Sequence, residues 1–164
     1  MDDARLVVFG YGNPSRGDDA AGPALIERLT ALQATRPDWP AAELLTDFQL
    51  QVEHAVDLQG RDLALFIDAH VACPAPFAFS RLGAARDVSY TTHAMTPAAL
   101  LYAYEQVYRR PPPPAFLLSV RGERFELGDS LSPAAETHLG AAARLLEKLC
   151  AQPDEPVWQQ YCSR

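Results

Sequence analysis

Three ionisable side chains stand where the chain passes from one expected element to the next. Asp19 opens a helical pattern after a glycine-rich turn, Asp68 follows the apolar run 63–67, and His93 precedes a helix that begins near Thr96. Two carboxylates and one imidazole suit a divalent metal of borderline character, such as nickel or zinc, and their charges balance a dication. We therefore interpret Asp19, Asp68 and His93 as a candidate metal site with open coordination positions.

The remaining histidines are weaker candidates for this site. His70 lies two residues after Asp68 and is at most a spare ligand. His54 and His138 fall within expected helices, and we predict structural roles for both.

The sequence offers little for nucleophilic hydrolysis. It contains no Gly-x-Ser-x-Gly elbow. Its cysteines form no Cys-x-x-Cys pair, and none stands beside a histidine in the sequence. An odd number of widely spaced cysteines predicts small buried or surface thiols in a reducing compartment, here at Cys73, Cys150 and Cys162.

The glycine-rich turn invites comparison with dinucleotide-binding motifs. Gly10 and Gly12 follow an apolar run, but Ser15 occupies the place of the third small residue. Asp18 and Asp19 would also meet a pyrophosphate where it requires bare N–H groups and positive potential. The pattern therefore disfavours a nucleotide site, and we expect Asp18 to cap the helix that follows.

Strand and helix patterns alternate along most of the chain, which predicts an α/β fold with a mainly parallel sheet and helices on both faces. The carboxyl ends of such strands carry ligand sites, and this is why Asp68 is a favoured candidate. The expected strands are 6–9, 43–48, 63–67, 77–82 and 115–120, and the expected helices are 19–32, 52–58, 97–108 and 133–149.

Length and charge limit the classes of function. A chain of 164 residues fits a single α/β domain, which we place at 1–150, followed by a weakly patterned tail at 151–164. The formal net charge of −7 argues against nucleic acid and membrane partners. The N-terminus shows no signal-peptide pattern, and no apolar stretch approaches the roughly 18 residues of a membrane span, so we expect a cytoplasmic protein.

The ordered motifs resemble those of the nickel-iron hydrogenase maturation proteases, the endopeptidases that trim the C-terminus of the hydrogenase large subunit. The resemblance covers nearly the whole chain, from about Leu6 to Leu149. The motifs that carry it are Gly-x-Gly-Asn at 10–13, Arg-Gly-Asp-Asp at 16–19, Gly22, Asp68, Thr-His-Ala-Met at 92–95, Ser-Val-Arg-Gly at 119–122 and Leu-Ser-Pro at 131–133.

This resemblance implies a three-layer α/β sandwich with a five-stranded, mainly parallel, twisted sheet. It also implies that Asp19, Asp68 and His93 are the catalytic, metal-contacting residues, and that they engage nickel already installed in the large-subunit precursor. The nickel is then supplied by the substrate, and no organic cofactor is expected of this monomeric enzyme. The segment 47–54 departs from the Asp-Gly-Gly that many members have at that place.

Alternative functions remain open at this point. The same three residues would serve a metal-binding assembly factor that docks on a client without cleaving it. A nucleotide-binding oxidoreductase is suggested only by the first glycines, and an enzyme with its own zinc is a further possibility. In the protease, nickel would either polarise the scissile carbonyl, activate a bound water, or only position the bond for a carboxylate base.

Overall fold

The computed structural model describes residues 4–86 and 95–163. Its centre is a five-stranded sheet with the order β2-β1-β3-β5-β4. The first four strands in this order run parallel, and β4 pairs with β5 in the antiparallel direction at one edge. The strands are β1 Leu6–Tyr11, β2 Ala42–Asp47, β3 Leu63–His70, β4 Phe77–Leu82 and β5 Ala115–Arg121.

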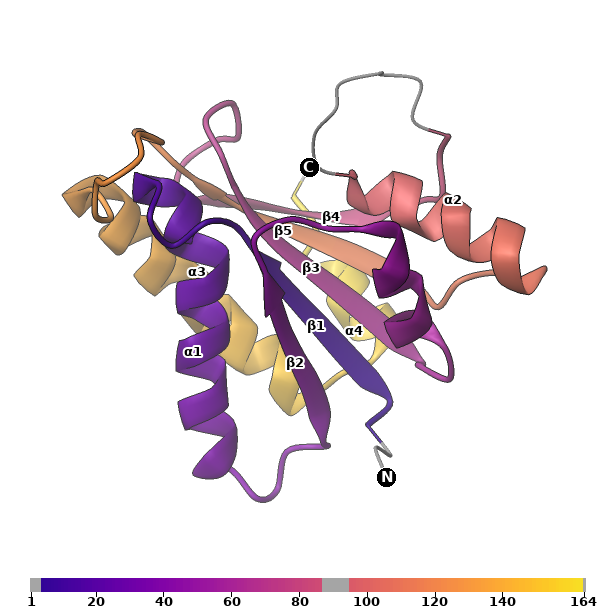
Figure 1. The fold of residues 1–164 in the computed structure, drawn as a ribbon. Coiled ribbons are helices and arrows are strands. Elements are labelled where there is room, and N and C mark those ends of the chain that lie inside the picture. Colours follow the sequence, from indigo (N-terminus) through magenta and orange to yellow (C-terminus); the bar gives the residue numbers. More distant parts are fainter. Residues whose placement is uncertain (1–3, 87–94, 164) are drawn as a thin grey trace.

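Helices cover both faces of this sheet, as Figure 1 shows, and the expected three-layer α/β architecture is confirmed. α1 and α3 pack on one face, and η2 and α2 pack on the other. No helix within the described ranges is long and apolar enough to cross a membrane. The helices are η1 Gly17–Ala20, which leads into α1 Ala21–Ala34, then η2 Val52–Leu58, α2 Pro97–Tyr108, α3 Pro133–Ala151 and α4 Glu155–Gln160.

The alternation of side chains along each strand builds two separate cores. In β1, Leu6 and Val8 join the cluster under α1 and α3, whereas Val7 and Phe9 join the cluster under η2 and α2. β3 divides its side chains between the two faces in the same way. The central strands are therefore buried on both faces, which explains why they are continuous apolar runs in the sequence.

Two helices begin as the sequence predicts. The Thr96 hydroxyl accepts the Ala99 N–H at 3.0 Å, and Pro97 occupies the first helical turn of α2. Ser132 plays the same part for α3 by accepting the Ala135 N–H at 3.1 Å. Proline fits the first turn because its missing N–H would have no partner inside the helix.

The segment after α3 contributes to the core, although its sequence pattern is weak. Trp158 of α4 is fully buried and packs edge-on against Phe79 and Phe116, with ring centroids 6.3 Å and 5.4 Å away. The indole N–H donates to the carbonyl oxygens of Leu149, at 3.0 Å, and Gln152, at 3.1 Å. A single aromatic anchor in a short helix gives no periodicity, so the pattern did not predict this contact.

Candidate active site

A row of polar side chains crosses the carboxyl ends of three neighbouring strands. Asp68 of β3 pairs with Ser119 of β5, and Tyr11 ends β1 directly after the pair of Gly10 with Ile67. Because side chains alternate along a strand, Tyr11, Asp68 and Ser119 all point to the face that η2 and α2 cover. The sequence predicted that β3 would end before Asp68, but pairing with β5 extends β3 to His70 and places Asp68 within the strand.

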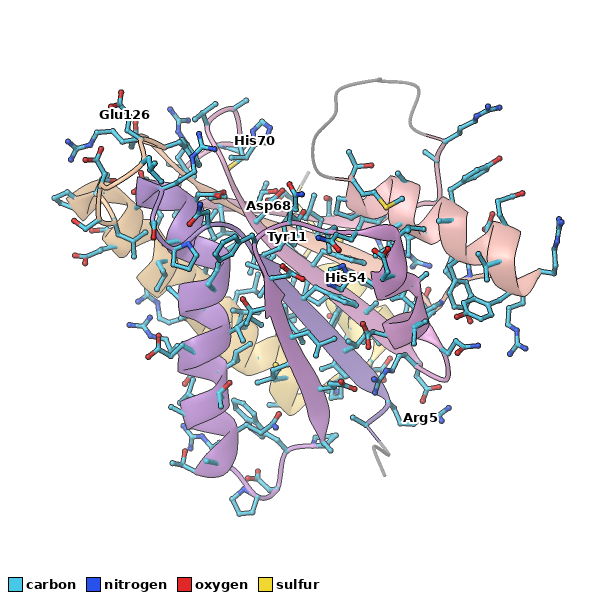
Figure 2. All side chains as sticks on the ribbon, viewed as in Figure 1. Arg5, Tyr11, His54, Asp68, His70 and Glu126 are labelled. Carbon is cyan, nitrogen blue, oxygen red and sulfur yellow. The ribbon has the colours of Figure 1, made fainter. Side chains whose placement is uncertain are left out.

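Each oxygen of the Asp68 carboxylate accepts a hydrogen bond from this row. The Ser119 hydroxyl donates to Asp68 Oδ1 at 2.7 Å, and the Tyr11 hydroxyl donates to Asp68 Oδ2 at 3.3 Å. Figure 2 shows Tyr11 and Asp68 together near the upper end of β3. Sequence reasoning missed Tyr11 and Ser119, since only the strand register brings them to Asp68.

Electrostatics couple Asp68 to its surroundings. Burial raises the pKa of the Asp68 carboxyl, while the hydrogen bond from Ser119, the charge of His70 and the hydrogen bond from Tyr11 act in the opposite direction. The negative charge of Asp19 adds to the rise in the pKa of Asp68. Burial also lifts the pKa of Tyr11 well above its usual value, with the charges of Asp68 and Asp19 adding to the effect, so Tyr11 remains a neutral donor at pH 7. A cation near the two carboxylates would relieve their repulsion.

Asp19 is fixed by the glycine-rich turn that precedes it. Its Oδ2 accepts the Asn13 N–H at 2.7 Å. Gly12 has a φ of +149°, and a Cβ at this position would lie 2.0 Å from the Asp19 carbonyl oxygen. Glycine is thus required at position 12 for the turn to pass so close to Asp19. Asp19 lines the same surface groove as Tyr11, and η1, which carries Asp19, packs against β3.

Asp18 has a different role from the helix cap that we expected. Neither η1 nor α1 has a side-chain cap, and Asp18 is fully buried. Burial raises the pKa of the Asp18 carboxyl, but the hydrogen bonds that it accepts bring the pKa below its usual value. These bonds come from distant residues and tie the turn to the segment that leads into α3: Glu123 N–H at 2.7 Å, Arg124 N–H at 3.1 Å, Ser132 N–H at 2.7 Å and Ser132 Oγ–H at 2.8 Å.

The backbone of the glycine-rich turn is already committed to internal hydrogen bonds. A pyrophosphate bound there would need free N–H groups. Each N–H of residues 12, 13 and 15–19 donates to another atom of the chain, which removes the donors on which the nucleotide alternative depends. The acceptors are, in chain order, Asp47 O, Asp19 Oδ2, Asn13 Oδ1, Asn13 O, Asp129 O, Arg124 O and Arg16 O.

His93, the third predicted ligand, lies outside the described residues. Met95 follows it by two positions and packs against the cluster under α2. Within the part of the chain that the structure describes, no group of three His, Cys, Asp or Glu side chains is arranged to hold a metal ion. The described members of the candidate set are Asp19 and Asp68.

The other histidines hold local structure. His54 Nδ1 accepts the Gln51 N–H at 2.8 Å, so the proton of the neutral ring is on Nε2, which lies 3.3 Å from Asp47 Oδ2. His138 Nδ1 lies 3.2 Å from the Arg121 carbonyl oxygen. These contacts agree with the structural roles predicted for both residues.

His70 is exposed at the end of β3, where its Nδ1 accepts the Ala72 N–H at 3.0 Å. It remains close enough for its charge to lower the pKa of Asp68. Figure 2 shows it on the same loop side of the sheet as Asp68.

The cysteines are free thiols, as the sequence predicted. Cys73 and Cys150 are buried, and Cys162 is partly exposed. Burial raises the pKa of Cys150 to about 12, so this thiol stays protonated and unreactive at neutral pH.

A surface groove includes Asp19 and Tyr11 in its lining. It is formed by the glycine-rich turn together with the segment that follows β2. Its lining residues are Tyr11, Gly12, Asn13, Arg16, Asp19, Phe48 and Gln49.

Several solved structures with this arrangement of elements carry the names of hydrogenase maturation enzymes. No protein-family model matches the sequence, and no curated protein matches it either. The maturating endopeptidase HybD from E. coli is 25% identical, with a TM-score of 0.66, over 88% of this chain and 91% of that chain. The [NiFe] hydrogenase maturation protease HycI from Thermococcus kodakarensis is 22% identical, with a TM-score of 0.67, over 90% of this chain and 92% of that chain, and it shows the shared fold.

The chain has the fold of the hydrogenase maturation endopeptidases. The match to HybD, a named endopeptidase that is 25% identical, agrees with the peptidase class that the sequence motifs indicated. Phe48 and Gln49, which depart from the Asp-Gly-Gly that the resemblance implies at this place, both line the groove beside Asp19.

Proposed function

We propose that this protein is an endopeptidase that removes the C-terminal extension of a nickel-iron hydrogenase large-subunit precursor after nickel insertion. The observation that carries the proposal is that η1, which holds Asp19, packs against β3, which holds Asp68, in a fold shared with a named maturation endopeptidase. The free thiols fit a reducing compartment, and we assign the protein to the cytoplasm as a monomer.

In this proposal, nickel is part of the substrate. Asp19, Asp68 and His93 contact the nickel that the precursor already holds, so that cleavage follows metal insertion. Oxygen and nitrogen ligands of this kind suit nickel, and two negative charges offset a dication. No organic cofactor is needed, because the metal arrives with the protein to be cut.

The surroundings of Asp68 suit a carboxylate that must contact a metal in a fixed orientation. Ser119 and Tyr11 each donate to one of its oxygens, which fixes the plane of the carboxylate. Such outer hydrogen bonds orient the residues that contact a metal. A nickel centre held in this way would place the adjacent peptide bond against the enzyme, and the same contact would position the bond for hydrolysis.

The main rival is a metal-binding assembly factor that docks on the precursor without cleaving it. The intact mass of the purified precursor after incubation with this protein separates the two functions. We expect the precursor to lose a C-terminal peptide with the wild-type chain and to stay intact with Asp68→Asn or His93→Ala, both of which should keep the fold. A precursor that binds but keeps its full mass would support the assembly factor, and wild-type rates in either variant would contradict the site assignment.

A further inference from the structure

The groove beside Asp19 is bordered by two segments that meet only in the folded chain. One is the glycine-rich turn, which contributes Asn13 and Arg16, and the other is the Phe48–Gln49 pair after β2. Asp19 lies in the groove itself. A protein that presents a metal to Asp19 must therefore lay the chain flanking that metal along this surface.

The glycine-rich turn, which forms the first wall of the groove, is fixed by hydrogen bonds to the segment 123–132. Hydrogen bonds join the glycine-rich turn to the segment 124–129, and the buried Asp18 carboxylate adds its own bonds to the same region. The pairs are Gly17 N–H to Asp129 O at 2.9 Å, Asp18 N–H to Arg124 O at 2.7 Å, Gly128 N–H to Ser15 O at 2.7 Å and Arg16 Nε–H to Phe125 O at 3.3 Å.

The Phe48–Gln49 pair, which forms the second wall, is anchored on both sides, at Asp47 and at Leu50. The Asp47 carbonyl oxygen accepts the Gly12 N–H at 3.0 Å, and Asp47 Oδ1 accepts the Phe48 N–H at 2.7 Å. His54 Nε2 lies 3.3 Å from the other Asp47 oxygen, and Leu50 is only 2% exposed in the core. Between these anchors the Phe48 side chain points outward and is 65% exposed.

We propose that this groove binds an extended segment of the precursor next to its metal, and that Phe48 is the specificity-determining residue that contacts an apolar side chain of that segment. This inference rests on the proposed function. Asn13, Arg16 and Gln49 supply polar groups that suit a peptide backbone, while Phe48 supplies the apolar contact area. Aromatic side chains of this kind are typical anchors in protein recognition.

Both walls are formed before the substrate arrives. Binding costs free energy whenever loops and side chains must be ordered, and the hydrogen bonds of the two walls reduce that cost. The exposed Phe48 ring, on a fixed backbone, can therefore be buried by the substrate without further ordering. Phe48 contributes to the affinity for the substrate, whereas the carboxylates act on the metal. The two contributions predict different kinetic effects.

Steady-state cleavage of the nickel-loaded precursor by the full chain tests this inference. We expect Phe48→Ala to raise KM about tenfold with little change in kcat, because a large part of the apolar contact is lost. Phe48→Leu should restore most of the KM, since it keeps an apolar side chain. The matched control is Val107→Ala near the C-terminal end of α2, where a side chain that is 61% exposed lies outside the groove lining, and its KM should equal that of wild type.

The outcomes separate this inference from the function on which it rests. If wild type cleaves and Phe48→Ala has the wild-type KM, or lowers only kcat, the proposed role of Phe48 is wrong while the endopeptidase function stands. If wild type does not cleave the precursor, the function itself fails. Because Phe48 is exposed, thermal unfolding of Phe48→Ala should match wild type, and a large drop in Tm would show that the effect on KM is structural and would overturn the inference.

Discussion

The Asp68 carboxylate is held on both of its oxygens by side chains from the two strands that flank β3. Ser119 Oγ lies 2.7 Å from one oxygen, and Tyr11 Oη lies 3.3 Å from the other. Ser119 is only 8% exposed, so water does not easily replace its hydroxyl. A carboxylate that loses one of these donors can rotate, and the geometry of whatever it contacts is then less well defined.

Ser119→Ala should therefore weaken the site without unfolding the protein. We expect a loss of about 10- to 100-fold in the processing rate of nickel-loaded precursor, the range typical when a hydrogen bond to a metal-contacting residue is removed. The measurement is the initial rate of product formation, with Ser80→Ala of β4 as a control for loss of an exposed strand hydroxyl. Unchanged processing by Ser119→Ala would show that Asp68 does not depend on this donor.

The buried Asp18 carboxylate links the glycine-rich turn to the segment before α3. Asp18 accepts bonds from residues that are 105, 106 and 114 positions away. This link holds the glycine-rich turn, and with it Asp19, against the body of the protein. The sequence showed an acidic residue at a helix start, for which capping is the usual role, and nothing local indicates partners so distant.

Asp18→Asn should lower the free energy of unfolding by about 3 kcal/mol at pH 7, since the amide leaves buried N–H donors without acceptors. The hydrogen bonds put the folded-state pKa of Asp18 below that of the unfolded chain. The carboxylate therefore stabilises the fold above about pH 4, and this contribution is lost as the pH falls through the folded-state pKa. Urea unfolding at pH 7 and near pH 3 checks both points, because the gap between wild type and variant should narrow in acid.

A gap that is the same at both pH values would contradict this account of Asp18. Asp38→Asn provides a control, because Asp38 is exposed in the loop between α1 and β2. Its effect on stability should stay within about 0.5 kcal/mol.

The sequence predicts the helices and strands better than it predicts the contacts within the site. Apolar runs and Thr-Pro or Ser-Pro starts placed the strands, α2 and α3 close to their observed bounds, because those signals are local. The turn at Gly12 and the place of Asp68 near the carboxyl end of β3 also followed from local pattern. Tyr11 and Ser119 could not be assigned in this way, since their roles depend on the register between β1, β3 and β5.

At the scale of the whole molecule, the end of the chain completes the core on the face that carries α1 and α3. Trp158 fills a space beside Phe79 and Phe116, and its indole N–H has two carbonyl acceptors. The strand β5, which holds Phe116 and pairs with β4, also carries Ser119 at the site. The packing of α4 and the position of Ser119 at the site therefore both depend on β5.

Trp158→Ala should lower the free energy of unfolding by about 4 kcal/mol, because it removes a large side chain from a packed core. Chemical denaturation followed by circular dichroism measures this loss. Tyr161→Ala is the matched control, since this aromatic side chain of the same segment is 39% exposed and should contribute about 0.5 kcal/mol or less. Equal stability of Trp158→Ala and wild type would show that α4 does not support the core.

The proposed endopeptidase differs from a general peptidase in that its cleavage depends on nickel in the precursor. The measurement is the intact mass of the large-subunit precursor after incubation with the wild-type chain, with nickel-loaded and nickel-free precursor compared side by side. The proposed function predicts loss of a single C-terminal peptide from the nickel-loaded precursor and an unchanged mass for the nickel-free one. Equal cleavage of both precursors, or cleavage of neither, would contradict it.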